Sequence, residues 1–303
     1  MGTCRVPATA ARFNNVRVSP RGFRLPLRGC ASPTAKILRR FAAVFPPCYL
    51  PSRGNRAINK SSISPIRPIE KNMSIKDGLN IVRERMVAAL ERAGRPADSA
   101  RLIAVSKTFP ASDVAEAYAC GQRVFGENRV QELKEKRPVL PSDIEWHLIG
   151  HLQANKVRHA LENSAWIHSV DSLELLERVV RISSELAVSP KVLLEINVSG
   201  EESKFGMKSD DVEAVLEKCP TPLCIGFMTV APFEATESEL HSIFAGLRNL
   251  RDRMESRCGR KFPELSMGMS GDFEIALAEG ATLVRVGSAI FGHRDYSKLE
   301  IRN

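Results

Sequence analysis

The sequence predicts an α/β protein, a single (β/α)8 TIM barrel preceded by a separate basic leader. The main observation is that eight short apolar runs alternate with helical patterns across residues 73–303. The runs are nearly continuously apolar, which is typical of parallel strands buried on both faces. Eight such units in 231 residues fit a closed barrel. No Gly-x-Gly-x-x-Gly motif follows an early strand to favour the alternative, an open doubly wound sheet.

The expected elements follow one another in a regular order. A helix over 74–95 comes first, because its apolar residues recur at intervals of three and four. The expected strands are 102–107, 123–128, 145–150, 166–171, 191–199, 223–230, 264–270 and 283–292. The helices expected between them are 111–120, 130–136, 153–162, 172–187, 209–218, 237–258 and 272–278. Pro110 suits a first helical turn, and Gly121 and Gly280 suit helix C-caps.

The positive charge of the chain is concentrated in its leader. The whole chain carries a formal charge of +9, yet residues 1–72 hold 14 basic residues and a single acid, Glu70. Scattered Arg, Ser, Ala and Pro with almost no acid are typical of a transit peptide. We therefore expect a disordered leader over 1–72 and a location in the mitochondrion or chloroplast. The alternatives are an extension without a targeting role, or a start at Met73 that leaves the protein cytoplasmic.

The composition of the body argues against several classes of protein. Residues 73–303 hold 30 basic and 34 acidic residues, so the basic charge of the whole chain does not indicate nucleic-acid binding. The apolar stretches of the leader are short and broken by Arg, so no membrane span is expected. The cysteines of the body show neither CxxC nor His-rich spacing, which argues against a disulfide framework or a metal site. They are Cys120, Cys219, Cys224 and Cys258.

Lys107 is the residue that points most directly to a function. It ends the expected strand 102–107, and in such barrels the C-terminal ends of the strands carry the functional residues. An amine at the mouth of an apolar barrel is partly desolvated, which disfavours the ammonium form. The amine is then a better nucleophile and is able to form a Schiff base. The alternative is a strand-end lysine that reaches solvent.

Two glycine and serine clusters end the last two expected strands. They are Ser266-Met-Gly-Met-Ser270 and Arg285-Val-Gly-Ser288. Small residues let backbone N–H groups approach an anion, and the late loops of such barrels are a frequent phosphate site. The alternative is that the glycines only form turns. Together with Lys107 and the guanidinium of Arg285, a phosphate cradle describes a pyridoxal 5′-phosphate (PLP) site.

Six segments of the chain closely resemble the pyridoxal phosphate homeostasis protein family. The resemblance covers about residues 76–296 and implies a barrel like the N-terminal domain of alanine racemase. The segments are Ala104-Val-Ser-Lys-Thr, Phe125-Gly-Glu-Asn-Arg-Val-Gln-Glu, Trp146-His-Leu-Ile-Gly-His-Leu-Gln-Ala-Asn-Lys, Ile196-Asn-Val-Ser-Gly-Glu-Glu-Ser-Lys-Phe-Gly-Met, Ser266-Met-Gly-Met-Ser and Val284-Arg-Val-Gly-Ser-Ala-Ile-Phe-Gly.

The resemblance also implies roles for individual residues. Lys107 would hold PLP as a Schiff base, and Arg285 would face the pyridine nitrogen. The residues implied at the phosphate or near it are Ser266, Gly287, Ser288, Met267, Gly268 and Asn128. Among the histidines, His147 is expected either beside the cofactor at the barrel mouth or in a packed structural position. His168 is expected to be structural or on the surface.

Members of the family are thought to bind, buffer and deliver PLP and to balance amino-acid and keto-acid pools, without established turnover. The resemblance therefore implies a non-catalytic carrier, whose partners are PLP and PLP-dependent client enzymes; we expect it to be monomeric. One alternative is an amino-acid racemase of low activity, which needs a base on the opposite face of the cofactor. None of Tyr49, Tyr118 and Tyr296 is an obvious candidate. A further alternative is a scaffold in which the bound cofactor is vestigial.

Overall fold

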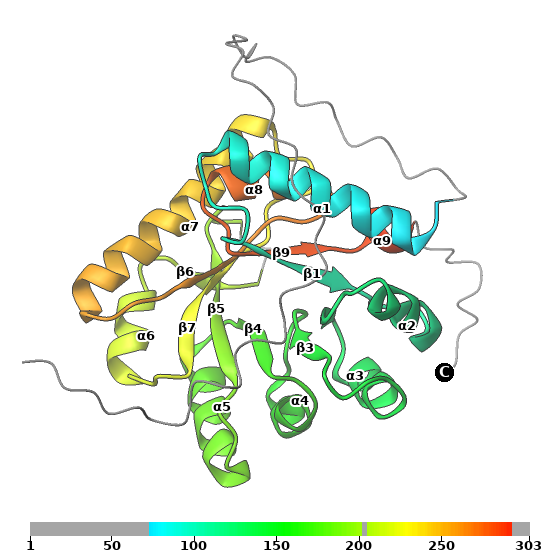
Figure 1. Cartoon of the computed structure of the whole chain (residues 1–303). Helices are drawn as coiled ribbons and strands as arrows, with labels where there is room; N and C mark the ends of the chain where they lie inside the picture. The colour runs from blue at the N-terminus through cyan, green and yellow to red at the C-terminus, as the bar shows by residue number, and fades with distance from the viewer. Residues whose placement is uncertain (1–72, 202–204, 293–303) are drawn as a thin grey trace, which may run out of the picture. The chain divides into compact units, whose positions relative to one another are not determined.

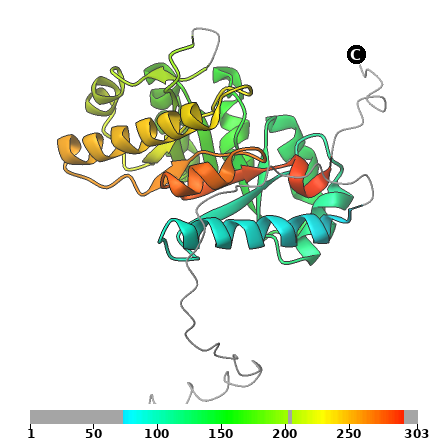
Figure 2. The same cartoon turned by 90° about the horizontal axis from the view of Figure 1, so that it is seen from above.

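The described part of the chain forms a closed barrel of parallel strands inside a ring of helices. The computed structural model describes residues 73–201 and 205–292. The expected leader, Tyr49 and Tyr296 lie outside the described residues. Figure 1 shows the helices around the strands, and Figure 2 shows the same arrangement from above. The predicted TIM barrel is confirmed.

Eight parallel strands close the barrel in the order β1-β2-β3-β4-β5-β7-β8-β9, with β9 paired to β1. A two-residue strand, β6 (Met207–Lys208), pairs only with β5. The barrel strands are β1 Arg101–Val105, β2 Val124–Glu127, β3 Glu145–Leu148, β4 Trp166–Val170, β5 Lys191–Asn197, β7 Cys224–Met228, β8 Glu264–Ser266 and β9 Leu283–Val286.

Helices follow the strands and cover the outside of the barrel. In chain order they are α1 Ile75–Arg92, α2 Ala111–Ala119, α3 Val130–Lys136, α4 Val157–Asn163, α5 Leu173–Leu186, α6 Val212–Lys218, α7 Glu237–Cys258, α8 Phe273–Ala278 and α9 Ser288–Phe291. Two short 3-10 turns, Arg137–Val139 and Ala154–Lys156, adjoin α3 and α4. Within the described ranges, no helix is both long enough and apolar enough to cross a membrane.

The strands have two different faces because successive side chains point to opposite sides. Five inward side chains form a small apolar cluster inside the barrel: Ile103, Trp166, Leu193, Met228 and Leu283. The outward side chains pack against the helices in one much larger core. Polar side chains occupy several of the remaining inward positions and the strand ends.

All eight expected strands are present, but each ends before its predicted run does. The polar and glycine residues that close each run leave the ladder and form the loops of the barrel mouth. The largest difference lies in the run 283–292, where the prediction of strand was wrong for the second half. Residues Ser288–Phe291 form α9, whose apolar Ala289 and Ile290 are buried. A short apolar run does not distinguish a strand from a buried helix.

Candidate cofactor site

Lys107 lies two residues after the end of β1, in the loop that follows this strand. Lys107 is partly buried and lies in a tight turn, closed by a 3.1 Å hydrogen bond from the Phe109 N–H to the Ser106 carbonyl oxygen. The next residue, Thr108, has a φ of 70°. The turn thus places Lys107 just beyond the C-terminal end of β1.

The neighbouring strand β9 carries Arg285 into the barrel. Ile103 of β1 lies opposite Arg285 in the parallel register. The guanidinium is buried: its Nη1 donates to Ser266 Oγ at 2.6 Å, and its Nη2 donates to the Thr229 carbonyl oxygen at 2.9 Å. Burial lowers the pKa of Arg285 to about 10, with Asp272 and Glu195 acting in the opposite direction. Arg285 therefore remains a fixed cation at neutral pH.

The loop after β9 lies directly against the end of β1. A Cβ atom at Gly287 would lie 3.2 Å from the Val105 carbonyl oxygen, so only glycine allows this approach without displacement. The backbone N–H groups of Gly287 and Ala289 both point at Ser270 Oγ, at 3.3 and 3.5 Å. The two amide donors, one just after β9 and one in the first turn of α9, thus converge on one hydroxyl oxygen of the loop after β8, close to the turn that holds Lys107.

The remaining residues implied at the phosphate fall into different environments. Ser288 is exposed at the start of α9. The side chain of Met267 is buried in the core between the barrel and the helices. Gly268 has a φ of 91°, and a Cβ there would lie 2.6 Å from the Cβ of Ala276, so this position requires glycine. Asn128 follows β2 and packs against Gly150.

Ser266 occupies a position inside the barrel rather than in the loop. Its hydroxyl is fully buried and lies between Arg285 and His168, whose Nδ1 is 2.9 Å from Ser266 Oγ. His147 also lies inside the barrel, stacked on Trp166 with ring centroids 4.7 Å apart. Both ring nitrogens of His147 have protein partners. This is the packed, hydrogen-bonded position that the sequence offered as the alternative to the barrel mouth.

A continuous column of hydrogen bonds joins these groups through the barrel interior. His147 Nε2 lies 2.9 Å from Glu145 Oε1, and His147 Nδ1 lies 2.8 Å from His168 Nε2. Arg101 also donates to Glu145 Oε1, at 2.9 Å. The column therefore runs from Arg285 near the mouth through Ser266 to the start of β1 and β3. His168 was not predicted as part of a site, although its inward parity on the strand would have indicated it.

The column has one consistent assignment of protons, with both histidines neutral. A carboxylate only accepts, so His147 donates from Nε2 to Glu145 and accepts at Nδ1 from His168. His168 then accepts the Ser266 hydroxyl hydrogen, and Ser266 accepts from Arg285. Burial lowers the pKa of His147 to about 4 and lowers that of His168 well below its ordinary value. Hydrogen bonding to His147 lowers the pKa of Glu145 to about 2.

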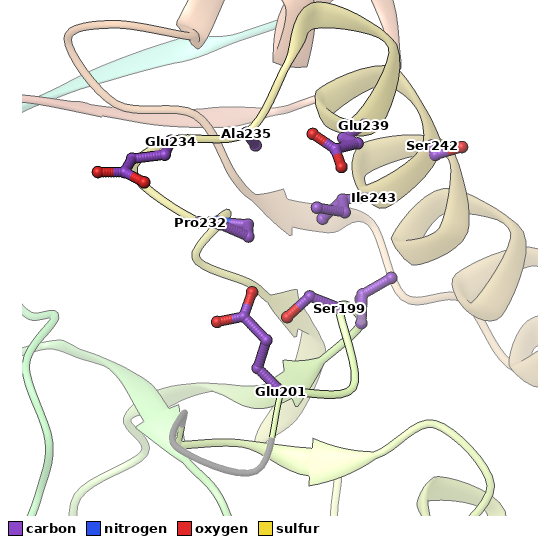
Figure 3. Close-up of a pocket in the computed structure, with 9 residues that line it drawn as sticks. Ser199, Glu201, Pro232, Glu234, Ala235, Glu239, Ser242 and Ile243 are labelled. Atoms are coloured by element: carbon purple, nitrogen blue, oxygen red, sulfur yellow. The ribbon is translucent and has the colours of Figure 1, made fainter.

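A separate pocket of about 450 Å³ opens beside the mouth, between the loops after β5 and β7 and the start of α7. Figure 3 shows the carboxylates of Glu201, Glu234 and Glu239 around it. Glu239 also caps α7, since its Oε2 accepts from the Thr236 N–H at 2.7 Å. Carboxylates repel a phosphate group, so this pocket is not a phosphate site.

The described residues bring no tyrosine to the barrel mouth. Tyr118 lies on α2, and its hydroxyl donates to Asp143 at 2.7 Å.

Burial raises the pKa of Glu195 to about 7, and Asp171 acts in the same direction. Glu195 lies two residues beyond the inward Leu193 on β5, so it belongs, like Arg285, to the inward polar groups of the barrel. In the described ranges no group of His, Cys, Asp and Glu could hold a metal ion.

Comparison with known proteins agrees with the fold. A family model for the alanine racemase N-terminal domain matches residues 80–295. The pyridoxal phosphate homeostasis protein of Aquifex aeolicus is 40% identical over 228 residues, covering 74% of this chain and 100% of that protein. The Homo sapiens protein of that name is 44% identical over 239 residues, covering 73% and 86%. The structure of PipY from Synechococcus elongatus with PLP bound is 43% identical, with a TM-score of 0.61, covering 70% and 100%.

The fold and the matched model define the chain as a barrel of the alanine racemase N-terminal domain class. This class includes enzymes, so the fold alone does not fix an activity. The identity and coverage of the relatives are more specific. The chain belongs to the family of pyridoxal phosphate homeostasis proteins.

Proposed function

We propose that this protein binds PLP at the mouth of the barrel, holds it as a Schiff base on Lys107, and buffers or delivers it without turnover. The observation that carries the proposal is the pairing of β1 with β9, which joins the Lys107 loop, Arg285 and the Gly287 loop in one small region. Relatives named for PLP homeostasis, and a related structure with PLP bound, support it.

The residues of the Gly287 loop fit a phosphate group. The N–H groups of Gly287 and Ala289 converge on the Ser270 hydroxyl oxygen, which is a neutral acceptor. An anionic oxygen is a stronger acceptor than a hydroxyl, so a phosphate oxygen would bind these donors in preference. The exposed Ser288 hydroxyl offers a further donor at the same loop.

The properties of Arg285 fit a carrier, and because alanine racemases resemble this arrangement they do not exclude an enzyme. Bound PLP supplies an electron sink through its ring, and that sink is strongest when the ring nitrogen is protonated. The two fixed hydrogen bonds of Arg285 keep a cation in place, and a cation disfavours protonation of a ring nitrogen that faces it. Tyr118 points to Asp143 on the outside, so it is not a base for the opposite face.

Covalent attachment is tested by absorbance and by trapping. The full chain is reconstituted with PLP, reduced with borohydride and mapped by mass spectrometry. We expect a visible absorbance band and a reduced adduct on Lys107, with both lost in Lys107→Ala and kept in Lys134→Ala, an exposed lysine of α3. Absence of the band and the adduct from the wild type would remove the proposal and leave the fold unchanged.

The distinction between carrier and racemase is tested by deuterium exchange at Cα of added amino acids. A carrier gives no Lys107-dependent exchange but transfers PLP to a PLP-free client enzyme. Robust exchange that disappears in Lys107→Ala would support the low-activity racemase instead. Gel filtration with light scattering tests the proposed monomer.

We also propose that residues 1–72 direct the protein to the mitochondrion or chloroplast. The support is the composition of the segment, with 14 basic residues and one acid. A fluorescent protein fused behind residues 1–72 should accumulate in one of these organelles. A diffuse cytoplasmic signal would favour either an extension without a targeting role or a start at Met73.

A further inference from the structure

A buried polar cluster lies behind the loop that carries Lys107. It consists of Glu127 at the end of β2 and of Glu132 and Lys136 on α3, and we call it the Lys136 cluster. Lys136 Nζ lies 2.7 Å from Glu127 Oε1 and 3.3 Å from Glu132 Oε2. The side chain of Glu127 is 0% exposed and that of Lys136 is 8% exposed. Charged side chains are rarely buried this completely unless they are paired.

The cluster does more than join α3 to β2, because it also bonds to the turn after β1. Lys136 Nζ donates to the Ser106 carbonyl oxygen at 2.9 Å, and the Ser106 hydroxyl donates to Glu127 Oε1 at 2.7 Å. The Thr108 N–H donates to Glu132 Oε2 at 2.6 Å. The Ser106 carbonyl and the Thr108 N–H belong to the two peptide groups that flank the Cα of Lys107. Both peptide groups are therefore held by charged side chains.

The turn needs such a hold because its backbone is strained. Thr108 has a φ of 70°, and a β-branched residue in the left-handed region is a genuine outlier. Conformations of this kind persist only where the surrounding structure determines them. The bond from the Thr108 N–H to Glu132 acts on the strained residue itself. A cluster that served only to attach α3 would need no bond to Ser106 or Thr108.

We propose that the Lys136 cluster positions the amine of Lys107, by fixing the two peptide groups that flank it and so setting the direction in which its side chain leaves the backbone. The task of that amine rests on the proposed function. Glu127, Glu132 and Lys136 are positioning residues in this proposal, because they act through the backbone of the turn and the Ser106 hydroxyl.

The test uses Glu132, the most exposed member of the cluster, so that the fold is kept. Glu132→Ala removes the acceptor for the Thr108 N–H, whereas Glu132→Gln keeps an oxygen atom at the same reach. Glu135→Ala is the matched control, since Glu135 lies on the exposed face of α3 and accepts only from Gln131 among the described residues. Hydrogen exchange of the Thr108 amide is measured in the full, cofactor-free chain.

We expect Glu132→Ala to speed exchange at Thr108 by about tenfold or more, because a hydrogen bond to a charged group accounts for at least that factor. Glu132→Gln and Glu135→Ala should stay close to the wild type. The rate of borohydride-trappable attachment of PLP to Lys107 should fall by about tenfold in Glu132→Ala, since misplacing a reacting group by an ångström costs up to about 10²-fold. Glu132→Gln should keep the wild-type rate of attachment.

Two results would overturn the positioning role alone. One is wild-type exchange at Thr108 in Glu132→Ala; the other is faster exchange with an unchanged rate of attachment. A wild-type protein that attaches no PLP to Lys107 would overturn the proposed function and the positioning role with it. The exchange measurement needs no cofactor, so the two failures are distinguishable.

Discussion

The neutral state of His147 makes a prediction about how stability depends on pH. Burial lowers the pKa of this histidine to about 4 in the folded protein, against about 6.5 in an unfolded chain. The unfolded state therefore binds the proton first as the pH falls. The stability that His147 contributes is present above about pH 6.5 and is lost progressively as the pH falls toward 4. We expect His147→Gln to remove this dependence.

The two pKa values give the size of the effect. Between about pH 7.5 and pH 5, His147 should lose about 2 kcal/mol of its contribution to the free energy of unfolding. The buried carboxyls act in the opposite direction, because burial raises the pKa values of Glu127 and Glu195. They are present in both proteins, so the difference between wild type and variant isolates His147.

The assay is urea unfolding of both proteins at several pH values across that range. At about pH 7.5 the variant should be less stable by about 1–3 kcal/mol, because the half-buried Glu145 and the buried His168 lose their hydrogen-bonding partner. Toward pH 5 the two curves should approach each other. A stability difference that does not change with pH would refute the assignment of a neutral histidine.

Three further predictions concern the barrel itself. Gly226→Ala should lower the free energy of unfolding in urea by about 3 kcal/mol or more, because the added Cβ would lie 1.9 Å from the Glu264 carbonyl oxygen. The control Gly271→Ala adds its Cβ in open space and should change the free energy of unfolding by less than about 0.5 kcal/mol. Thr236→Ala should cost about 1 kcal/mol, since it removes the capping box of α7; an unchanged midpoint would contradict this. Burial raises the pKa of Cys224 to about 12, so a thiol reagent should label Cys224 only after unfolding, as peptide mapping would show.

The fold was predictable because each barrel strand is buried on both faces. Runs such as Leu102–Val105 and Leu283–Val286 contain little but apolar residues, apart from the inward Arg285. This pattern identifies parallel strands without knowledge of their partners. The ends of the runs were less predictable, because whether a polar residue stays in the ladder depends on its neighbours in space.

The candidate site was predictable where the chemistry is local and not where it depends on distant contacts. Lys107 and the Gly287 loop stand at strand ends, and position in the chain is enough to indicate them. The bond between His168 and Ser266 joins residues 98 apart in sequence. Lys136 lies in a helix rich in Lys and Glu, which resembles a solvated surface, and only its pairing with Glu127 explains its burial. The sequence around His168 and the sequence around Lys136 do not by themselves reveal these contacts.

The seam between β1 and β9 has a consequence for the order of events during synthesis. These are the first and last strands of the barrel, and the proposed site draws Lys107 from one side of the seam and Arg285 from the other. A growing chain in which β9 has not emerged possesses the lysine without its partners. PLP binding would therefore report that the barrel has closed. A ligand that binds residues next to both β1 and β9 also stabilises the closed barrel relative to every partly folded form in which these two strands are not yet paired.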